Sequence, residues 1–186
     1  MRHGRPDLPR NPIFMDREQF NQYLAAYDEA GLSIQETERL HRLYKAYPKP
    51  DLVVASDLPR ALQTAHIFAR GSEVVVDPVF REIPVWLPPD ASMFLTHRWP
   101  GEFWWSYLRY HWFLDQEPEG KRRSTERAQE AIRHFEEYQK QGPRVAVVSH
   151  AGFLLLLINV LQRDHRILGR RLPHIGFGLP TVYHWR

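Results

Sequence analysis

The chain has 186 residues and a mass of 22.1 kDa, which is enough to bury the core of one ordinary domain. Hydrophobic residues make up 43% and charged residues 25% of the sequence, a balance that excludes an intrinsically disordered chain. There is no cysteine, so disulfides, thiolate zinc sites and a cysteine nucleophile are all excluded.

The charge and the apolar runs bear on partners. The net charge is only +3 and the arginines are scattered, which argues against nucleic acid as a partner. The longest apolar run, residues 153–160, is far shorter than the roughly 18 residues of a membrane span. No signal or transit peptide is visible at the N-terminus, so we expect a cytoplasmic location.

In chain order, the first two elements are predicted to be helices. Residues 16–29 have apolar side chains at helical spacing, and Gly31 follows them. Ser33 and Glu36 form a capping-box sequence that begins a second helix, and Pro48 lies beyond its end. Both helices therefore precede the first apolar strand.

Short apolar runs then alternate with helical segments. The predicted strands are residues 52–55, 73–77, 144–148 and 181–185, and the predicted helices are residues 58–71, 103–113, 125–140 and 152–161. This alternation indicates an α/β fold, with a largely parallel central sheet between two layers of helices. No internal repeat or linker is present, so a single domain over residues 1–186 is expected.

Three polar groups of residues follow strands or begin the chain: Arg2-His3-Gly4, Ser56-Asp57-Leu58-Pro59-Arg60 and Ser149-His150-Ala151-Gly152. Because active sites of α/β folds lie beyond the carboxyl ends of the strands, we expect these groups to meet. Arginine forks match phosphate oxygens and remain charged at any relevant pH. Two arginines and two histidines in one place therefore indicate a phosphoryl-binding pocket.

These segments, together with Phe80-Arg81-Glu82-Ile83, resemble the histidine phosphatase superfamily, also called the phosphoglycerate mutase-like family. The resemblance extends over nearly the whole chain and implies a three-layer α/β/α sandwich. It implies a metal-independent phosphatase, a phosphoric monoester hydrolase without a cofactor, that acts on a small phosphorylated substrate. An arginine or histidine in these segments has a plain alternative as a solvated charge or a core residue.

The resemblance also implies the roles of individual residues. His3 would be the catalytic nucleophile and carry a phosphohistidine intermediate. Arg2, Arg60 and His150 would bind the phosphoryl oxygens, and His150 would also take part in catalysis. Glu82 would be the general acid and base. Arg5 and Arg10 would either add to the phosphate pocket or face solvent, and the remaining histidines lack the spacing of a metal site.

The sequence departs from the family in two places. Only Met1 precedes Arg2, where the family has a complete central strand, so the first strand looks truncated and we expect an upstream start or another segment or subunit to fill the gap. Residues 86–117 form an aromatic-rich helical insertion that contains Trp104, Trp105 and Trp112. The insertion either covers the site as a lid or packs as core helices.

Two other functions stay open. Phosphoglycerate mutases share the sequence Arg2-His3-Gly4 but are generally longer chains, so a mutase-like phosphotransferase is the less favoured enzyme. A noncatalytic module that binds a phosphorylated ligand or a protein is the alternative from another class, and a membrane-surface role of the aromatic segment is weaker still. The substrate and the oligomeric state, including a homo-oligomer, are beyond the sequence.

Overall fold

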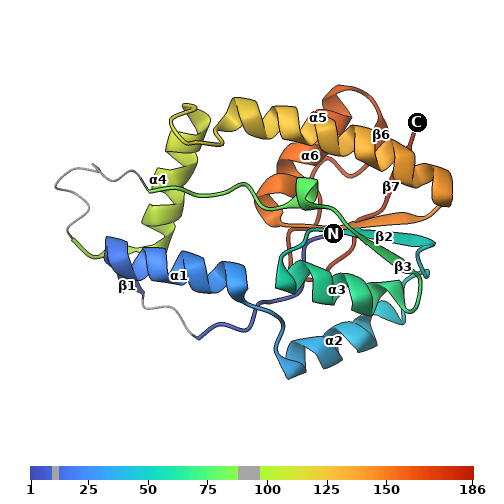
Figure 1. Ribbon diagram of the computed structural model, residues 1–186, viewed down its shortest axis with the longest axis horizontal. Helices are drawn as coiled ribbons and strands as arrows, with labels where there is room; N and C mark the ends of the chain where they lie inside the picture. Colours follow the sequence, from blue (N-terminus) through green and yellow to red (C-terminus); the bar gives the residue numbers. More distant parts are fainter. Residues whose placement is uncertain (10–12, 88–96) are drawn as a thin grey trace.

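A computed structural model describes residues 1–9, 13–87 and 97–186 of the chain (Figure 1). The helices are α1 (Arg17–Glu29), α2 (Ile34–Tyr44), α3 (Pro59–Ala69), α4 (Gly101–Phe113), α5 (Lys121–Tyr138) and α6 (Ala151–Arg163), with short 3-10 turns η1 (Pro78–Phe80) and η3 (Gln139–Gln141). The strands are β1 (Phe14–Met15), β2 (Leu52–Ala55), β3 (Glu73–Val76), β4 (Trp99–Pro100), β5 (Val145–Val148), β6 (Ile167–Gly169) and β7 (Tyr183–Trp185).

The central sheet is parallel and has the order β3-β2-β5. In β2 every side chain is buried, which explains why an uninterrupted apolar run predicted this strand. Leu52 and Val54 face α5 and α6, whereas Val53 and Ala55 face α2 and α3. Figure 1 shows the two layers of helices on opposite sides of the sheet, so the predicted α/β/α sandwich is confirmed.

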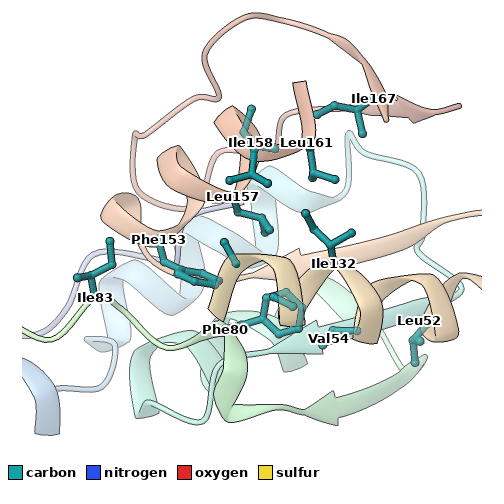
Figure 2. Packing of buried hydrophobic residues seen from close by; sticks show 13 residues of the cluster. Leu52, Val54, Phe80, Ile83, Ile132, Phe153, Leu157, Ile158, Leu161 and Ile167 are labelled. Carbon is teal, nitrogen blue, oxygen red and sulfur yellow. The ribbon is translucent and has the colours of Figure 1, made fainter. Parts of the chain in front are cut away.

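Each face of the sheet packs against its layer of helices in a cluster of buried hydrophobic side chains, and the cluster on the α5/α6 side is the larger of the two. Phe80 and Phe153 meet edge to face at 6.3 Å, and Ile132 and Leu157 extend the contact along the helices (Figure 2). An aromatic pair of this geometry stabilises a fold by about 0.5–1.5 kcal/mol beyond the area that it buries. Because Phe80 follows β3 and Phe153 lies in the first turn of α6, their packing fixes the two segments that lead into the predicted site.

A third cluster lies away from the sheet, between α1 and α4. Trp104 is fully buried there, stacks on Phe20 at 5.4 Å, and donates its Nε1–H to the carbonyl of Met15 at 2.9 Å. The described part of the aromatic-rich segment is therefore a helix held by its own core. Residues 88–96 of the predicted insertion lie outside the described residues.

Three details differ from the sequence expectations. The predicted final strand exists as β7, but it pairs antiparallel with β6 and lies outside the central sheet. Ser33 caps α2 as predicted, but Glu36 accepts from the backbone of Arg5 and from Arg39, so the reciprocal half of the predicted box is not observed. A complete capping box instead begins α1, between Asp16 and Gln19.

The start of the chain lies alongside the end of β5. The amide of Ser149 donates to the carbonyl of Met1 at 3.0 Å, and the amide of His3 donates to Ser149 at 2.9 Å. Arg2 and Ser149 thereby form a parallel bridge. An apolar cavity of about 570 Å³, bordered by Met1 and Val147, extends beside β5. The expectation that an upstream start, another segment or a subunit completes the strand before Arg2 stays a prediction.

Candidate active site

The carboxyl ends of β2 and β5 bring the predicted residues together. Ser56 directly follows β2, His150 follows β5, and the chain start is bridged to Ser149. The rings of His3 and His150 lie 4.9 Å apart between centroids, and both side chains are almost fully buried. The Nε–H of Arg60 donates to Nε2 of His3 at 3.3 Å. Three of the residues that the sequence singled out therefore form one buried cluster.

The hydrogen bonds of His3 define its tautomer. Its Nδ1 lies 2.6 Å from the carbonyl oxygen of Gly4, and a carbonyl can only accept, so Nδ1 carries the proton. Nε2 is then unprotonated and accepts from Arg60. Burial, supported by the charges of Arg60 and Arg2, lowers the pKa of His3 to about 3, while the Gly4 carbonyl opposes this shift. His3 is therefore neutral at physiological pH, with a lone pair on Nε2.

His150 presents the complementary arrangement. Its Nε2 lies 2.9 Å from the hydroxyl of Ser56, which also accepts from the amide of Leu58 at 3.3 Å. Ser56 can thus donate its proton to Nε2, which leaves the proton of His150 on Nδ1. That Nδ1 is buried and has no hydrogen-bond partner in the described part of the chain. Burial first, and then the charges of His3 and the nearby arginines, lower the pKa of His150 well below its usual range.

The two arginines differ in how many of their donors are engaged. Arg60 has no exposed surface; it donates to the carbonyl of Tyr27 at 2.5 Å and reaches the carboxylate of Asp28 at 3.3 Å. Arg2 lies 3.7 Å above the ring of Phe177 and donates to the carbonyl of Ile175 at 2.9 Å. The Nε–H of Arg2 is buried without a partner among the described residues.

A cavity of about 450 Å³ adjoins this cluster and is lined by Arg2, Arg60 and Glu82. Glu82 lies at the N-terminus of α6, where its Oε1 accepts from the amides of Ile83 at 3.0 Å and Phe153 at 2.8 Å. Within the described residues, its Oε2 has one contact, a longer one of 3.2 Å to the amide of Gly152. A Cβ at position 152 would lie 2.7 Å from Oε1, so only glycine allows this approach.

The remaining predicted residues lie elsewhere. Arg5 is exposed and is not among the residues that line the cavity; its guanidinium lies 5.9 Å from the ring of Phe177. Arg10 lies outside the described residues. In the described ranges, no three histidine or acidic side chains are grouped as metal ligands would be. The helices of the same ranges include none with the length and apolar character required to cross a bilayer.

The sequence reasoning missed several residues of this region. Arg109, Glu117 and Tyr23 line the cavity. Trp105, a member of the aromatic-rich insertion that the sequence singled out, lines it too. The guanidinium of Arg127 donates to the carbonyls of Val79, Arg81 and Glu82, and so fixes the segment that carries Glu82. None of these residues follows a strand, so the signal that found the others did not mark them.

The comparison with family models decides the family. The model of the histidine phosphatase superfamily (branch 1) matches residues 1–177. The chain belongs to the histidine phosphatase superfamily. No curated protein sequence matches the chain.

Two solved structures have a fold similar to that of this chain. A mycobacterial glucosyl-3-phosphoglycerate phosphatase in complex with inorganic phosphate is 18% identical, with a TM-score of 0.57 over 87% of this chain and 76% of that chain. A phosphoserine phosphatase of Entamoeba histolytica, in complex with 3-phosphoglyceric acid, is 17% identical, with a TM-score of 0.56 over 100% of this chain and 94% of that chain. At these identities the likeness concerns the fold.

Proposed function

We propose that this protein is a phosphatase that hydrolyses a small phosphomonoester through a phosphohistidine intermediate on His3. The observation that carries the proposal is the buried pair of His3 and His150 with Arg60 at hydrogen-bond distance, beside a cavity large enough for a small substrate. Membership of the superfamily supports it. The unprotonated Nε2 of His3 is the atom that would attack phosphorus.

The neighbouring groups would stabilise the transferring phosphoryl group. The Nε–H of Arg2 and the Nδ1–H of His150 are buried donors without partners in the described ranges, so phosphoryl oxygens would satisfy both. Arg60 would release Asp28 and Nε2 of His3 as its guanidinium turns to the substrate. Together the two guanidinium groups would offset the charge that develops during transfer, without a metal ion.

Glu82 is the proposed proton donor to the leaving alcohol and the base for the attacking water. Its Oε2 is the oxygen for this role, because among the described residues it accepts one long hydrogen bond whereas Oε1 accepts two. The hydrogen bonds to Oε1 would hold the carboxyl group in place while Oε2 exchanges the proton.

The test is phosphate release from 4-nitrophenyl phosphate by the wild type, by His3→Ala and by His41→Ala, an exposed histidine of α2 that serves as the control. We expect EDTA-resistant release by the wild type and by His41→Ala, and a loss of at least about 10³-fold in His3→Ala. Denaturation with detergent at alkaline pH, during turnover of ³²P-labelled substrate, should trap an acid-labile, base-stable phosphoenzyme only when His3 is present.

The same experiment separates the alternatives. A mutase would release little phosphate without a bisphosphorylated primer. A noncatalytic binding module would form no phosphoenzyme, although it would bind phosphate or vanadate. Equal activity of His3→Ala and the wild type would refute the proposed nucleophile.

A further inference from the structure

Glu117 is a buried acid for which the chemistry above has no use. It lies in the segment between α4 and α5, has 7% of its surface exposed, and lines the same cavity as Arg2 and Arg60. Neither of its carboxylate oxygens has a hydrogen-bond partner within the described ranges. An unpaired buried carboxyl group destabilises a fold, so its presence calls for a group that it can accept from.

The cavity that Glu117 lines has several aromatic side chains in its wall. Tyr23, Trp105 and Trp112 contribute to the lining, and the indole N–H of Trp112 is already bound to Ser124 at 3.0 Å. Trp112 therefore offers its ring and not a donor. Rings of this kind attract cations, and the guanidinium of Arg109 already lies 5.1 Å from the Trp112 ring.

We propose that Glu117 and the aromatic wall of Tyr23, Trp105 and Trp112 form a leaving-group subsite that selects phosphomonoesters whose alcohol or phenol carries a protonated amine. This inference rests on the proposed function, because the phosphoryl group must occupy the end of the cavity near Arg2 and Arg60. The ammonium would donate to the free oxygens of Glu117 and stack against the rings. An uncharged leaving group would leave the carboxylate unpaired.

The charge state of Glu117 is compatible with this role in mildly alkaline solution. Burial raises the pKa of Glu117 to about 7, and the positive charge of Arg109 opposes that shift. Assays at pH 8.5 therefore present the carboxylate to the ligand. Arg109 also competes for the same carboxylate, so its removal should favour an incoming ammonium.

The test uses aryl phosphates that differ only at one terminal group: 4-(aminomethyl)phenyl, 4-(hydroxymethyl)phenyl and 4-ethylphenyl phosphate. A second pair, phosphoethanolamine and propyl phosphate, tests a shorter distance between the phosphoryl group and the amine. The kcat/KM of each compound is measured at pH 8.5 for the wild type, Glu117→Gln, Arg109→Gln and the control Glu126→Gln, an exposed acid of α5. Ratios between wild type and variant cancel the intrinsic reactivity of each ester.

We expect Glu117→Gln to lower kcat/KM for an amine-bearing ester by at least about 10-fold, since hydrogen bonds between charged groups are the strong ones. The same variant should change kcat/KM for 4-ethylphenyl phosphate or propyl phosphate by less than about 3-fold. Glu126→Gln should leave every ratio of variant to wild-type kcat/KM unchanged, and Arg109→Gln should increase the preference for the amine-bearing ester. Glutamine keeps the shape of glutamate, so the variant remains foldable.

Three results would overturn the inference. If the wild type hydrolyses 4-ethylphenyl and 4-(aminomethyl)phenyl phosphate equally well, the subsite proposal fails while the phosphatase proposal stands. The same conclusion follows if Glu117→Gln lowers kcat/KM for both esters by the same factor. If the wild type hydrolyses none of the esters and forms no phosphoenzyme, the proposed function fails and the subsite fails with it.

Discussion

The burial of His3 predicts a specific dependence of stability on pH. The pKa of His3 falls from 6.5 to about 3 on folding, chiefly because the imidazole is removed from water. Between these two values the unfolded chain binds a proton at this residue and the folded chain does not. Stability therefore rises with pH across this window, is fully present above about pH 6.5, and is lost as the pH falls toward 3.

The size of the effect follows from the pKa values. Each pH unit below 6.5 removes about 1.4 kcal/mol for one such group, so His3 alone destabilises the fold by ~2 kcal/mol at pH 5 relative to pH 7.5. This is a substantial part of the 5–15 kcal/mol that typical domains have. The pKa of His150 moves in the same direction, so the wild type should be markedly sensitive to acid.

The assay is urea unfolding at pH 7.5, 6.5, 5.5 and 5, with the wild type and His3→Gln compared at each pH. Glutamine does not titrate, so the variant should lose about 2 kcal/mol less than the wild type between pH 7.5 and pH 5. His41→Gln, which replaces an exposed histidine, should follow the wild type. Parallel curves for wild type and His3→Gln would refute the claim that His3 is buried in its neutral form.

Three further predictions concern the site. Glu82→Gln should lower kcat/KM for an alkyl phosphate by about 10²-fold or more but that for 4-nitrophenyl phosphate much less, because nitrophenolate leaves without a proton and kcat/KM does not include the later attack of water; equal losses in kcat/KM would contradict the acid role. Asp28→Asn should lower the Kd for inorganic phosphate, measured by calorimetry, because the carboxylate reaches Arg60 at 3.3 Å and competes with the ligand. A higher Kd in the variant would contradict this and show that Asp28 orients the arginine. Gly4→Ala should destabilise the protein by about 1–3 kcal/mol in urea unfolding, because its Cβ would lie 2.7 Å from a leucine methyl group, whereas Gly101→Ala, with a nearest atom at 3.4 Å, should be tolerated. Equal stabilities of the two glycine variants would contradict the packing argument.

The elements that could be predicted are those whose side chains are sorted by burial. The strand at residues 52–55 was found with its bounds because all of its side chains are buried, and the helices because their buried faces repeat at helical spacing. The grouping of His3, Arg60 and His150 followed from the position of the chemistry beyond parallel strands. In each case one local pattern was sufficient.

The features that escaped prediction depend on contacts between distant segments. In the part of the chain that the structure describes, β6 and β7 pair only with each other. The short strands β1 and β4 pair because α1 and α4 pack together around Trp104. Glu36 has the sequence of a capping residue, but Arg39 and the amide of Arg5 compete for its carboxylate and win. Such competition is settled by tertiary structure, which no local pattern encodes.

Glu117 shows why the proposed leaving-group end of the cavity is harder to find than the proposed phosphoryl end. Its segment has no periodicity, and a glutamate between a helix and a proline is most simply a solvated charge. Only its burial, with no hydrogen-bond partner among the described residues, distinguishes it. The proposed phosphoryl end uses the backbone geometry of strand ends, which is common to many folds, whereas the proposed leaving-group end is built from α1, α4 and the segment between α4 and α5. Selectivity can therefore change through a few side chains such as Glu117 while His3 and its neighbours remain in place.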